Sequence, residues 1–423
     1  MGRVLLTTIG SLGDLHPLIG IGLELRRRGH TVGFCTSEAY RARIKSLGFE
    51  FDPLRPNASP ENEAAAELVR EIMDPKSGVE RLLCDWILPE LRSTYLDLLQ
   101  AVTRAPRAEL LVSGELVYPA PLIAEKFSVP WASCTTAPMS FFSAHDPPVL
   151  APVPNLSKLL RRFGPGINQA AFNLMKRVTR SWSEPVRTLR AELGLAAGKD
   201  PIYEGKFSPS LVLAMFSPIL AAPQPDWPPN TVLTGFPFYD GPAGISSLPA
   251  GLAKFLEDGE PPIVFTLGSS AVLDPGRFYE ESAAAADLLK RRAVLLMGDN
   301  PHPARLPNGV AAFGYVRFSD LFPKAAAVVH QGGIGTTGQT MRAGLPMLVM
   351  PYNFDQPDNA ARITRLGLGQ SIPRGAYRSN RVAGQLNEIL NAGNYRNNAM
   401  TIGAIVQKEN GATAAADALQ RLL

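Results

Sequence analysis

The sequence has 423 residues, of which 45% are hydrophobic and 19% are charged. Because a single hydrophobic core seldom grows past roughly 250 residues, this length predicts two domains. The 42 basic residues nearly balance the 38 acidic ones, and the formal charge of +4 excludes the strongly basic surface typical of nucleic-acid-binding proteins.

Cysteine content and the N-terminus indicate the compartment. Cys35, Cys84 and Cys134 lack the paired spacing of a zinc site or a disulfide framework. The apolar stretch after Arg3 is too short for a signal peptide, and no run of 18 apolar residues follows. We therefore expect a cytoplasmic protein.

The first half alternates strand and helix patterns. Residues 4–9 form an apolar strand, a glycine turn follows, and apolar residues then recur at helical spacing as far as the cations and glycine at 26–29. A strand at residues 31–36 completes a βαβ unit. Further strands are predicted at residues 110–112 and 131–135.

The second half repeats this architecture after a proline-rich stretch at residues 218–242, which is typical of a connecting segment. Strands are predicted at residues 263–267, 293–297, 326–329 and 347–350. The predicted fold class is α/β, with two Rossmann-like doubly wound domains facing a cleft. The expected boundaries are 1–225 for the N-terminal domain, 226–245 for the linker, 246–405 for the C-terminal domain and 406–423 for a final helix that can pack back on the N-terminal domain.

A glycine-rich loop follows the strand at 326–329. Gly332, Gly333 and Gly335 lead into a helix, whose N-terminal N–H groups attract anions, so the loop predicts a diphosphate cradle. It lacks the Gly-Lys-Ser/Thr of a Walker loop and the Gly-x-Gly-x-x-Gly of a dinucleotide fold. A tight turn without a ligand is the alternative for the glycines taken alone.

The loop after the first strand carries Asp14 and His16, either of which can take a proton from an acceptor hydroxyl. For Asp14 the competing interpretation is a helix N-cap, and for His16 it is a hydrogen-bonded packing histidine beside Pro17. The sequence alone leaves both open.

These residues carry a family resemblance that covers nearly the whole chain. The block from His330 through Gly344-Leu345-Pro346 to residues 354–360 resembles the donor-binding signature of the UDP-glycosyltransferase superfamily, family 1, which has the two-domain fold called GT-B. The loop at 10–14 is similar to that of bacterial antibiotic and sterol glycosyltransferases. Residues 143–148 and 226–237 resemble the rhamnosyltransferases of rhamnolipid synthesis.

The resemblance implies roles for individual residues. Asp14 is the expected catalytic base, His16 is the runner-up, and Glu115 stands where relatives have a second acid that holds the base. On the donor side, the resemblance implies that Tyr315 and Val316 lie near a uracil or thymine base and that Gln339 faces the ribose. Asp355 and Gln356 are expected to bind sugar hydroxyls, and the remaining donor-binding residues are expected to bind the diphosphate. The expected donor-binding residues are Ser269, Ser270, Tyr315, Val316, His330, Gln331, Gly332, Gly333, Gly335, Thr336, Thr337, Gln339, Asp355 and Gln356. His330 and Gln331 are not ranked against each other, and for Asp355 and Gln356 a helix N-terminal cap is the alternative.

The charge that develops during sugar transfer determines which groups the enzyme needs. Negative charge builds on the leaving diphosphate, so positive dipoles are needed there and a base is needed behind the acceptor. Because the chain has no Asp-x-Asp pair to hold a divalent ion, we expect no cofactor and no metal, with a nucleotide sugar as co-substrate. A single displacement inverts the anomeric centre. The predicted enzyme moves glucose or rhamnose from a UDP- or dTDP-sugar to a small, largely apolar acceptor such as a lipid, sterol, polyketide or phenolic.

The sequence signals for residues that contact the acceptor are less specific than those for the donor. Residues 158–190 hold eight Lys/Arg and one acid, with apolar residues interleaved, a pattern typical of a membrane-surface helix, of a cover over an amphiphilic acceptor or of an ordinary solvated helix face. Trp131, Met139, Phe141 and Phe142 can line an acceptor pocket or belong to the core.

Two other classes of function remain. A nucleotide-sugar epimerase has a similar architecture but needs no acceptor. The unusual Gly114-Glu115 and His330-Gln331 favour a catalytically silent partner that binds a nucleotide sugar. The presence of Asp14, Asp355 and Gln356 argues against a loss of catalytic activity.

Overall fold

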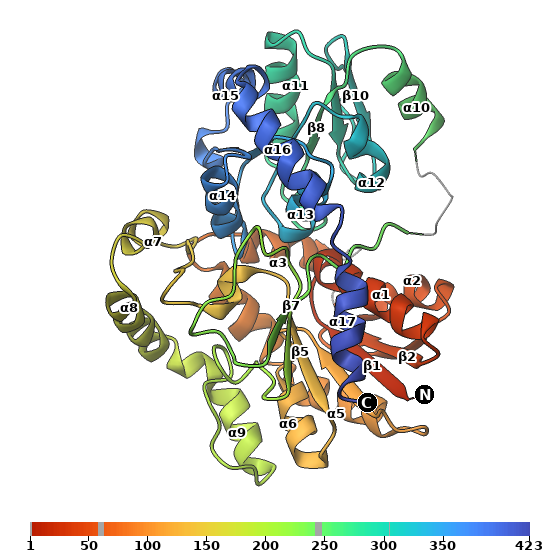
Figure 1. Ribbon diagram of the computed structural model, residues 1–423, viewed down its shortest axis with the longest axis vertical. Helices are drawn as coiled ribbons and strands as arrows, with labels where there is room; N and C mark the ends of the chain where they lie inside the picture. Colours follow the sequence, from red (N-terminus) through yellow and green to blue (C-terminus); the bar gives the residue numbers. More distant parts are fainter. Residues whose placement is uncertain (1, 58–62, 242–247, 304) are drawn as a thin grey trace. The chain divides into compact units, whose positions relative to one another are not determined.

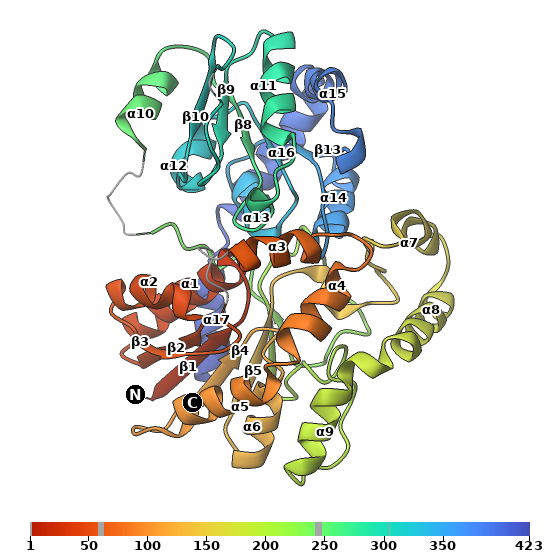
Figure 2. The same ribbon diagram turned by 180° about the vertical axis from the view of Figure 1, so that it is seen from behind.

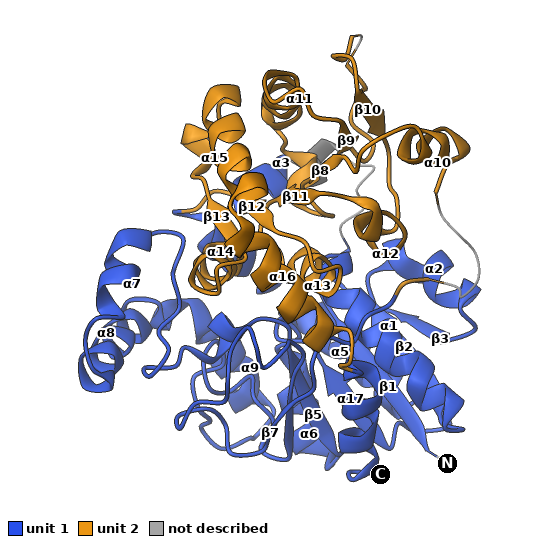
Figure 3. Cartoon of the chain, turned by 45° about the horizontal axis from the view of Figure 1, so that its top comes forward, with its two compact units in different colours: residues 1–72, 76–239, 410–423 blue, residues 73–75, 240–409 orange. Residues whose placement is uncertain are grey.

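The computed structural model describes residues 2–57, 63–241, 248–303 and 305–423. The chain divides into two compact units, shown in Figure 3. Unit 1 comprises residues 1–72, 76–239 and 410–423, and unit 2 comprises residues 73–75 and 240–409.

Unit 1 is built on a seven-stranded parallel sheet with the order β3-β2-β1-β4-β5-β6-β7 (Figure 1). Every residue of its central strands is buried, as expected for a parallel sheet with helices on both faces. The strands are β1 (Arg3–Thr8), β2 (Thr31–Thr36), β3 (Glu50–Pro53), β4 (Leu110–Ser113), β5 (Trp131–Thr135), β6 (Leu211–Ala214) and β7 (Thr231–Leu233). The α-helices are α1 (Leu12–Arg27), α2 (Arg41–Ser46), α3 (Glu63–Ile72), α4 (Gly78–Glu80), α5 (Leu91–Thr103), α6 (Pro119–Phe127), α7 (Pro154–Leu160), α8 (Pro165–Val178), α9 (Glu184–Glu192) and α17 (Gly411–Gln420). A π-helical segment, η2 (Arg81–Ile87), and the 3-10 turns η1 (Glu38–Tyr40), η3 (Pro138–Phe141) and η4 (Arg180–Ser183) complete it.

Unit 2 has a six-stranded parallel sheet with the order β10-β9-β8-β11-β12-β13. Its strands are β8 (Ile263–Thr266), β9 (Ala293–Leu296), β10 (Val310–Phe313), β11 (Ala327–His330), β12 (Met347–Val349) and β13 (Gly369–Ser371). Its helices are α10 (Ala250–Glu257), α11 (Phe278–Leu288), α12 (Phe318–Leu321), α13 (Ile334–Arg342), α14 (Gln356–Arg365), α15 (Ser379–Asn391) and α16 (Gly393–Val406), with the 3-10 turns η5 (Ala271–Leu273), η6 (Phe322–Lys324) and η7 (Arg374–Ala376).

Both sheets reverse their strand order at one point. In unit 1 the reversal lies between β1 and β4, and in unit 2 it lies between β8 and β11. At such a point the loops leaving the carboxyl ends of the two strands diverge and leave a crevice where ligands bind in open α/β sheets. The predicted α/β fold with two doubly wound sheets is confirmed, and the two reversal points locate the candidate sites.

The C-terminal helix belongs to unit 1. Figures 1 and 2 both show α17 beside α1, and it packs against α1 and β6. Arg28, at the C-terminus of α1, pairs with Asp417 at 2.6 Å. Apart from the short excursion at residues 73–75, the chain thus enters unit 2 at residue 240 and returns to unit 1 at residue 410.

The segment expected as a linker at 226–245 contains a strand. Thr231 pairs with Val212, so β7 extends the sheet of unit 1 by one edge strand. The prolines on either side do not prevent this, because proline is tolerated outside the paired residues of an edge strand. Residues 242–245 of the expected linker lie outside the described residues.

Within the described residues, no helix has both the length and the apolar character needed to cross a bilayer.

Candidate active site

In unit 1 the reversal point brings Asp14 and Glu115 to one edge of the sheet. Asp14 follows β1 and Glu115 follows β4, and these strands pair directly, with Thr7 opposite Ser113. The two carboxyl groups lie close enough for the charge of Glu115 to act on Asp14. The crevice of unit 1 therefore contains two acids.

Asp14 lies in the first turn of α1. The N-cap of this helix is Ser11, and Asp14 completes a capping box by accepting the Ser11 N–H at 2.8 Å. Asp14 is thus the third residue of the helix rather than its cap. Because a carboxylate can accept up to about four hydrogen bonds, capping leaves room for a role as base.

The environment of Asp14 suits proton transfer. The pKa of this carboxyl is raised from 3.8 to about 6, mainly by burial and also by the nearby charge of Glu115, while the hydrogen bond from the Ser11 N–H opposes the shift. A general base works best when its pKa lies near the operating pH. Asp14 is therefore ionised at neutral pH but remains a stronger base than an ordinary aspartate.

His16 is held differently. Arg43 lies 2.9 Å from His16 Nε2, and because a guanidinium only donates, this nitrogen accepts and the ring proton sits on Nδ1. The ring also meets Tyr239 edge-on at 5.4 Å. The basic nitrogen of His16 is already occupied, so the geometry favours Asp14 as the base.

Glu115 is neutralised by a lysine that sequence patterns did not single out. Lys206 Nζ lies 2.6 Å from Glu115 Oε2, and the Thr135 hydroxyl donates to the other carboxyl oxygen. The lysine side chain is buried, and its ammonium group lies over the rings of Phe142 and Phe207. No local signal marks Lys206, because its partner is 91 residues away in the chain.

In unit 2 three loops meet at one edge of the sheet. Residues 268–270 follow β8, residues 331–333 follow β11, and residues 350–355 follow β12; these three strands pair in parallel. Ser269 is exposed and Ser270 partly exposed on the first of these loops.

The glycines of these loops allow close packing around Gln331. Gly268 and Gly332 have φ values of +67° and +91°, which favour glycine. A Cβ at Gly268 would lie 2.3 Å from Gln331 Nε2, and one at Gly333 would lie 2.8 Å from the same atom. Gln331 therefore lies between the loops after β8 and β11.

The N-terminus of α13 is open. The Ile334 N–H donates to Asp355 Oδ2 at 3.2 Å, whereas the next two N–H groups, of Gly335 and Thr336, have no partner within the helix because of helix geometry. Apart from its chain neighbours and the backbone of its own helix, no atom of the described residues lies within 4 Å of the position that a Cβ on Gly335 would take. The helix start therefore presents free donors beside open space, as an anion site requires.

Two buried oxygens beside this helix start lack partners. Gln331 Oε1 and Thr337 Oγ1 form no hydrogen bond with any described residue. Buried polar atoms are nearly always paired. The Thr337 hydroxyl can donate to an anion, whereas the Gln331 oxygen can only accept a hydrogen bond.

The structure distinguishes His330 from Gln331. His330 is completely buried; its Nδ1 accepts the Gly332 N–H at 3.0 Å, so its proton sits on Nε2, 3.3 Å from Met347 Sδ. Burial lowers its pKa to about 3, and the ring is neutral. His330 shapes the loop, and Gln331 is the residue of this pair with an available polar atom.

The other predicted donor residues are mostly engaged. Gln339 donates to Asp240 Oδ1 at 3.0 Å and accepts from Arg342 at 2.7 Å. Gln356 accepts the Tyr352 N–H at 2.9 Å, and the Val316 side chain is fully buried in the core of unit 2.

Among the remaining donor residues, Tyr315 is 64% exposed. The Asp355 carboxylate accepts a hydrogen bond from the Ile334 N–H at the start of α13 and another from the Asn359 side chain at 2.7 Å. Asn359 was not predicted, although it joins this network by donating to the Gly332 carbonyl as well.

Comparisons with known proteins identify the family. Residues 4–86 match the glycosyltransferase family 28 N-terminal domain, and residues 292–419 match the erythromycin biosynthesis protein CIII-like C-terminal domain. The O-mycaminosyltylonolide 6-deoxyallosyltransferase of Streptomyces fradiae is 31% identical over 86% of this chain and 84% of its own length. The chain belongs to the family 1 glycosyltransferases.

More distant relatives are also glycosyltransferases. A sterol 3-beta-glucosyltransferase of Komagataella phaffii is 27% identical over 98% of this glycosyltransferase, which spans only 34% of that longer protein. The solved structure of the glycosyltransferase VinC in complex with dTDP matches with a TM-score of 0.68 at 20% identity, covering 99% of each chain, which supports the GT-B fold.

Of the residues expected around an acceptor, Trp131, Phe141 and Phe142 pack against or hydrogen-bond to other side chains of unit 1. Phe141 stacks on Trp227 at 4.2 Å and on Phe207 at 5.4 Å, and it is buried. Trp131 donates to Ser113 Oγ at 2.9 Å and is buried as well. Phe142 packs edge-on against neighbouring rings and is partly exposed, as is Met139.

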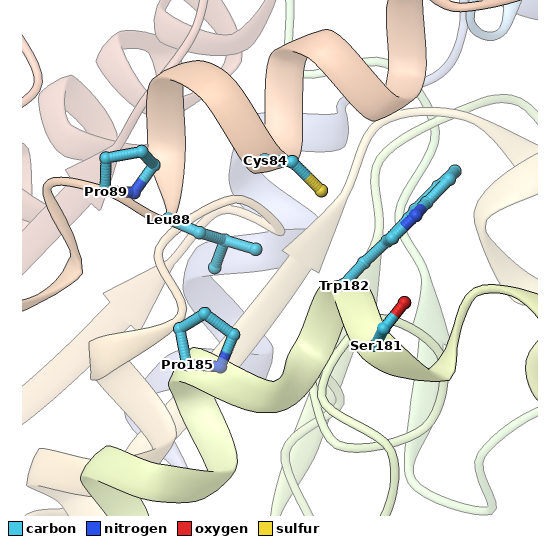
Figure 4. Close-up of a pocket in the computed structure, with 6 residues that line it drawn as sticks. All are labelled: Cys84, Leu88, Pro89, Ser181, Trp182 and Pro185. Carbon is cyan, nitrogen blue, oxygen red and sulfur yellow. The ribbon is translucent and has the colours of Figure 1, made fainter.

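The glycosyltransferase has an apolar cavity elsewhere in unit 1. It has a volume of about 350 Å³, and Figure 4 shows that η2 and the residues next to it form one wall and η4 and the start of α9 the other. It is lined by Cys84, Leu88, Pro89, Ser181, Trp182 and Pro185. Glu115 and Tyr118 line a second, smaller hollow of unit 1. Burial, the charge of Glu115 and, more weakly, Cys84 raise the pKa of the Tyr118 hydroxyl. Three of the six residues that line the apolar cavity, Ser181, Trp182 and Pro185, lie within residues 158–190, for which a cover over an amphiphilic acceptor was one of the expected alternatives, and the other three were not assigned to a pocket.

Lys206→Met should shift the acid limb of the pH–rate profile upward, because losing the buried cation leaves the charge of Glu115 uncompensated and that charge raises the pKa of Asp14. Lys206→Arg keeps the charge and should restore the profile. The measurement is kcat/KM from pH 4.5 to 8.5. An unchanged limb in the methionine variant would show that Lys206 has only a packing role.

Proposed function

We propose that this glycosyltransferase moves a hexose, glucose or rhamnose, from a UDP- or dTDP-sugar to a hydroxyl of a small apolar acceptor, with inversion and without a metal ion. The observation that carries the proposal is the open start of α13, where the N–H groups of Gly335 and Thr336 and the unpaired Thr337 hydroxyl are available as donors. A diphosphate supplies the oxygens that such donors bind.

The proposed mechanism assigns a task to each unit. The N–H groups of Gly335 and Thr336 and the Thr337 hydroxyl stabilise the negative charge that builds on the leaving diphosphate. Asp14 removes the proton from the acceptor hydroxyl as this oxygen attacks the anomeric carbon. One displacement of this kind inverts the configuration at that carbon.

An apolar acceptor fits the cavity lined by Cys84, Leu88 and Trp182. Its volume of about 350 Å³ lies at the lower end of the range for small-molecule sites, roughly 300–1,000 Å³. Relatives named for a sterol and for a tylonolide acceptor also favour a largely apolar substrate.

The first experiment is thermal unfolding with UDP, dTDP, GDP, NAD and their common sugar conjugates. A ligand that binds only the folded state adds about 2.7 kcal/mol of stability at 100 times its Kd, and we expect this shift with UDP or dTDP compounds alone. No shift with any compound would contradict the donor assignment and favour a silent partner.

The stabilising donor then enters an assay with sterol, polyketide and phenolic acceptors in excess chelator. We expect full activity, product only when an acceptor is present, and an inverted anomeric configuration by NMR. Loss of activity that magnesium restores would refute metal independence, and conversion of the donor without an acceptor would indicate an epimerase.

A further inference from the structure

Exposed apolar side chains gather on one part of unit 1. Of the fourteen large apolar side chains that the described residues expose, seven lie between residues 153 and 178, including Leu174 at 62% and Val178 at 72% exposure. The seven are Val153, Leu156, Leu159, Phe163, Ile167, Leu174 and Val178. They lie on α7, on α8 and beside these two helices, which lie at the edge of unit 1 in Figures 1 and 2.

On α8 these residues form one face. Ile167, Leu174 and Val178 are spaced at i, i+7 and i+11, which aligns them along the helix. A different face holds the helix to unit 1: Phe172 is buried against Phe142, and Asn168 donates to the Ala144 carbonyl at 2.8 Å. The apolar stripe is therefore not the face that anchors the helix.

Cations surround the stripe and acids are absent. From residue 147 to residue 183 the sequence has no Asp or Glu but six basic residues. Arg161 pairs with Asp146 and Lys176 with Glu204. The other four form no ion pair with any residue that the structure describes: Lys158, Arg162, Arg177 and Arg180.

We propose that the α7–α8 hairpin, residues 153–180, docks on an anionic lipid surface. Its leucine, isoleucine, valine and phenylalanine side chains enter the boundary between headgroups and acyl chains, and its unpaired cations meet the headgroups. A symmetric contact between two copies would instead place the cations of one hairpin against those of its partner. The charge of the hairpin favours the lipid surface.

The test is flotation of the full-length chain with vesicles of phosphatidylcholine alone or with 30% phosphatidylglycerol. We expect binding to the anionic vesicles, weaker binding at 0.5 M salt because salt screens the cations, and little binding to phosphatidylcholine. Arg162→Glu with Arg177→Glu should lower partitioning more than tenfold, since each cation near an anionic surface is worth about 1 kcal/mol, roughly fivefold. Leu174→Ser with Val178→Ser should also abolish binding.

The matched control is Leu96→Ser, which removes a leucine of 60% exposure from α5 and should bind like the unaltered protein. Melting temperature and nucleotide-induced stabilisation verify that each variant folds. Failure of the unaltered protein to float with anionic vesicles overturns the proposal, as does equal binding by the Leu174→Ser, Val178→Ser variant. A concentration-dependent dimer that this variant abolishes would assign the surface to a second copy instead.

Discussion

Asp14→Asn is expected to lower kcat by about 10²–10⁴-fold while leaving nucleotide affinity within about twofold. The amide oxygen of asparagine can still accept the Ser11 N–H, so the capping box survives and only the base is lost. In the unaltered enzyme kcat/KM should rise with pH to a plateau above about pH 6, the pKa of Asp14. The variant should lack this limb. Steady-state kinetics across pH and nucleotide titration make the measurement.

The pH dependence of folding stability provides the control for the Asp14→Asn variant. Because the folded-state pKa of Asp14 lies above its ordinary value, ionisation of Asp14 destabilises the folded protein as pH rises through about 6. The asparagine variant should therefore be as stable as the unaltered protein below pH 4 and more stable above pH 6, by up to about 3 kcal/mol. A fully active asparagine variant, with activity lost on His16→Ala, would transfer the role of base to His16.

Gly335→Leu is expected to weaken UDP or dTDP binding by more than about tenfold without lowering the melting temperature. The side chain would extend from the first turn of α13 into open space, where it meets no protein atom within 4 Å of its Cβ but would cover the free N–H groups. Leucine is also a better helix former than glycine, by up to about 1 kcal/mol. Isothermal titration with the nucleotide tests this.

The matched control is Gly384→Leu in α15. Gly384 is also an exposed helical glycine in unit 2 with no atom within 4 Å of a Cβ, but it lies on a helix that carries none of the predicted donor residues. The control should bind nucleotide normally. Unaltered affinity in Gly335→Leu would move the diphosphate away from α13.

Local sequence patterns were sufficient to predict most strands of the two sheets. The strands predicted at residues 31–36 and 131–135 match β2 and β5 residue for residue, because short apolar runs bounded by turns leave few alternatives. β7 was missed, since its three residues lie within a proline-rich stretch and only pairing with β6 makes them a strand. The loop at 331–333 was located because glycines between a strand and a helix restrict the backbone in a recognisable way.

Long-range contacts explain what the sequence left open. Nothing near His330 indicates that both of its nitrogens point inward to Gly332 and Met347, and nothing near Gln339 reveals its bond to Asp240, 99 residues away. Phe141 was expected to line an acceptor pocket, but it is buried and stacks on Trp227, a contact between residues 86 positions apart in the sequence. Which side chains remain available to a ligand depends on tertiary contacts that periodicity does not encode.

The return of the chain to unit 1 at α17 determines how hybrid enzymes should be made from this protein and a relative. A crossover at a single point near residue 240 would join unit 1 of one parent to a final helix from the other, and Arg28 would lose its match to Asp417. Gly411 would be exchanged as well, although a Cβ there would lie 2.4 Å from the Phe236 backbone. Exchanging residues 240–409 as one insert keeps both contacts, so a library built with two crossovers should yield many more folded hybrids than one built with a single crossover.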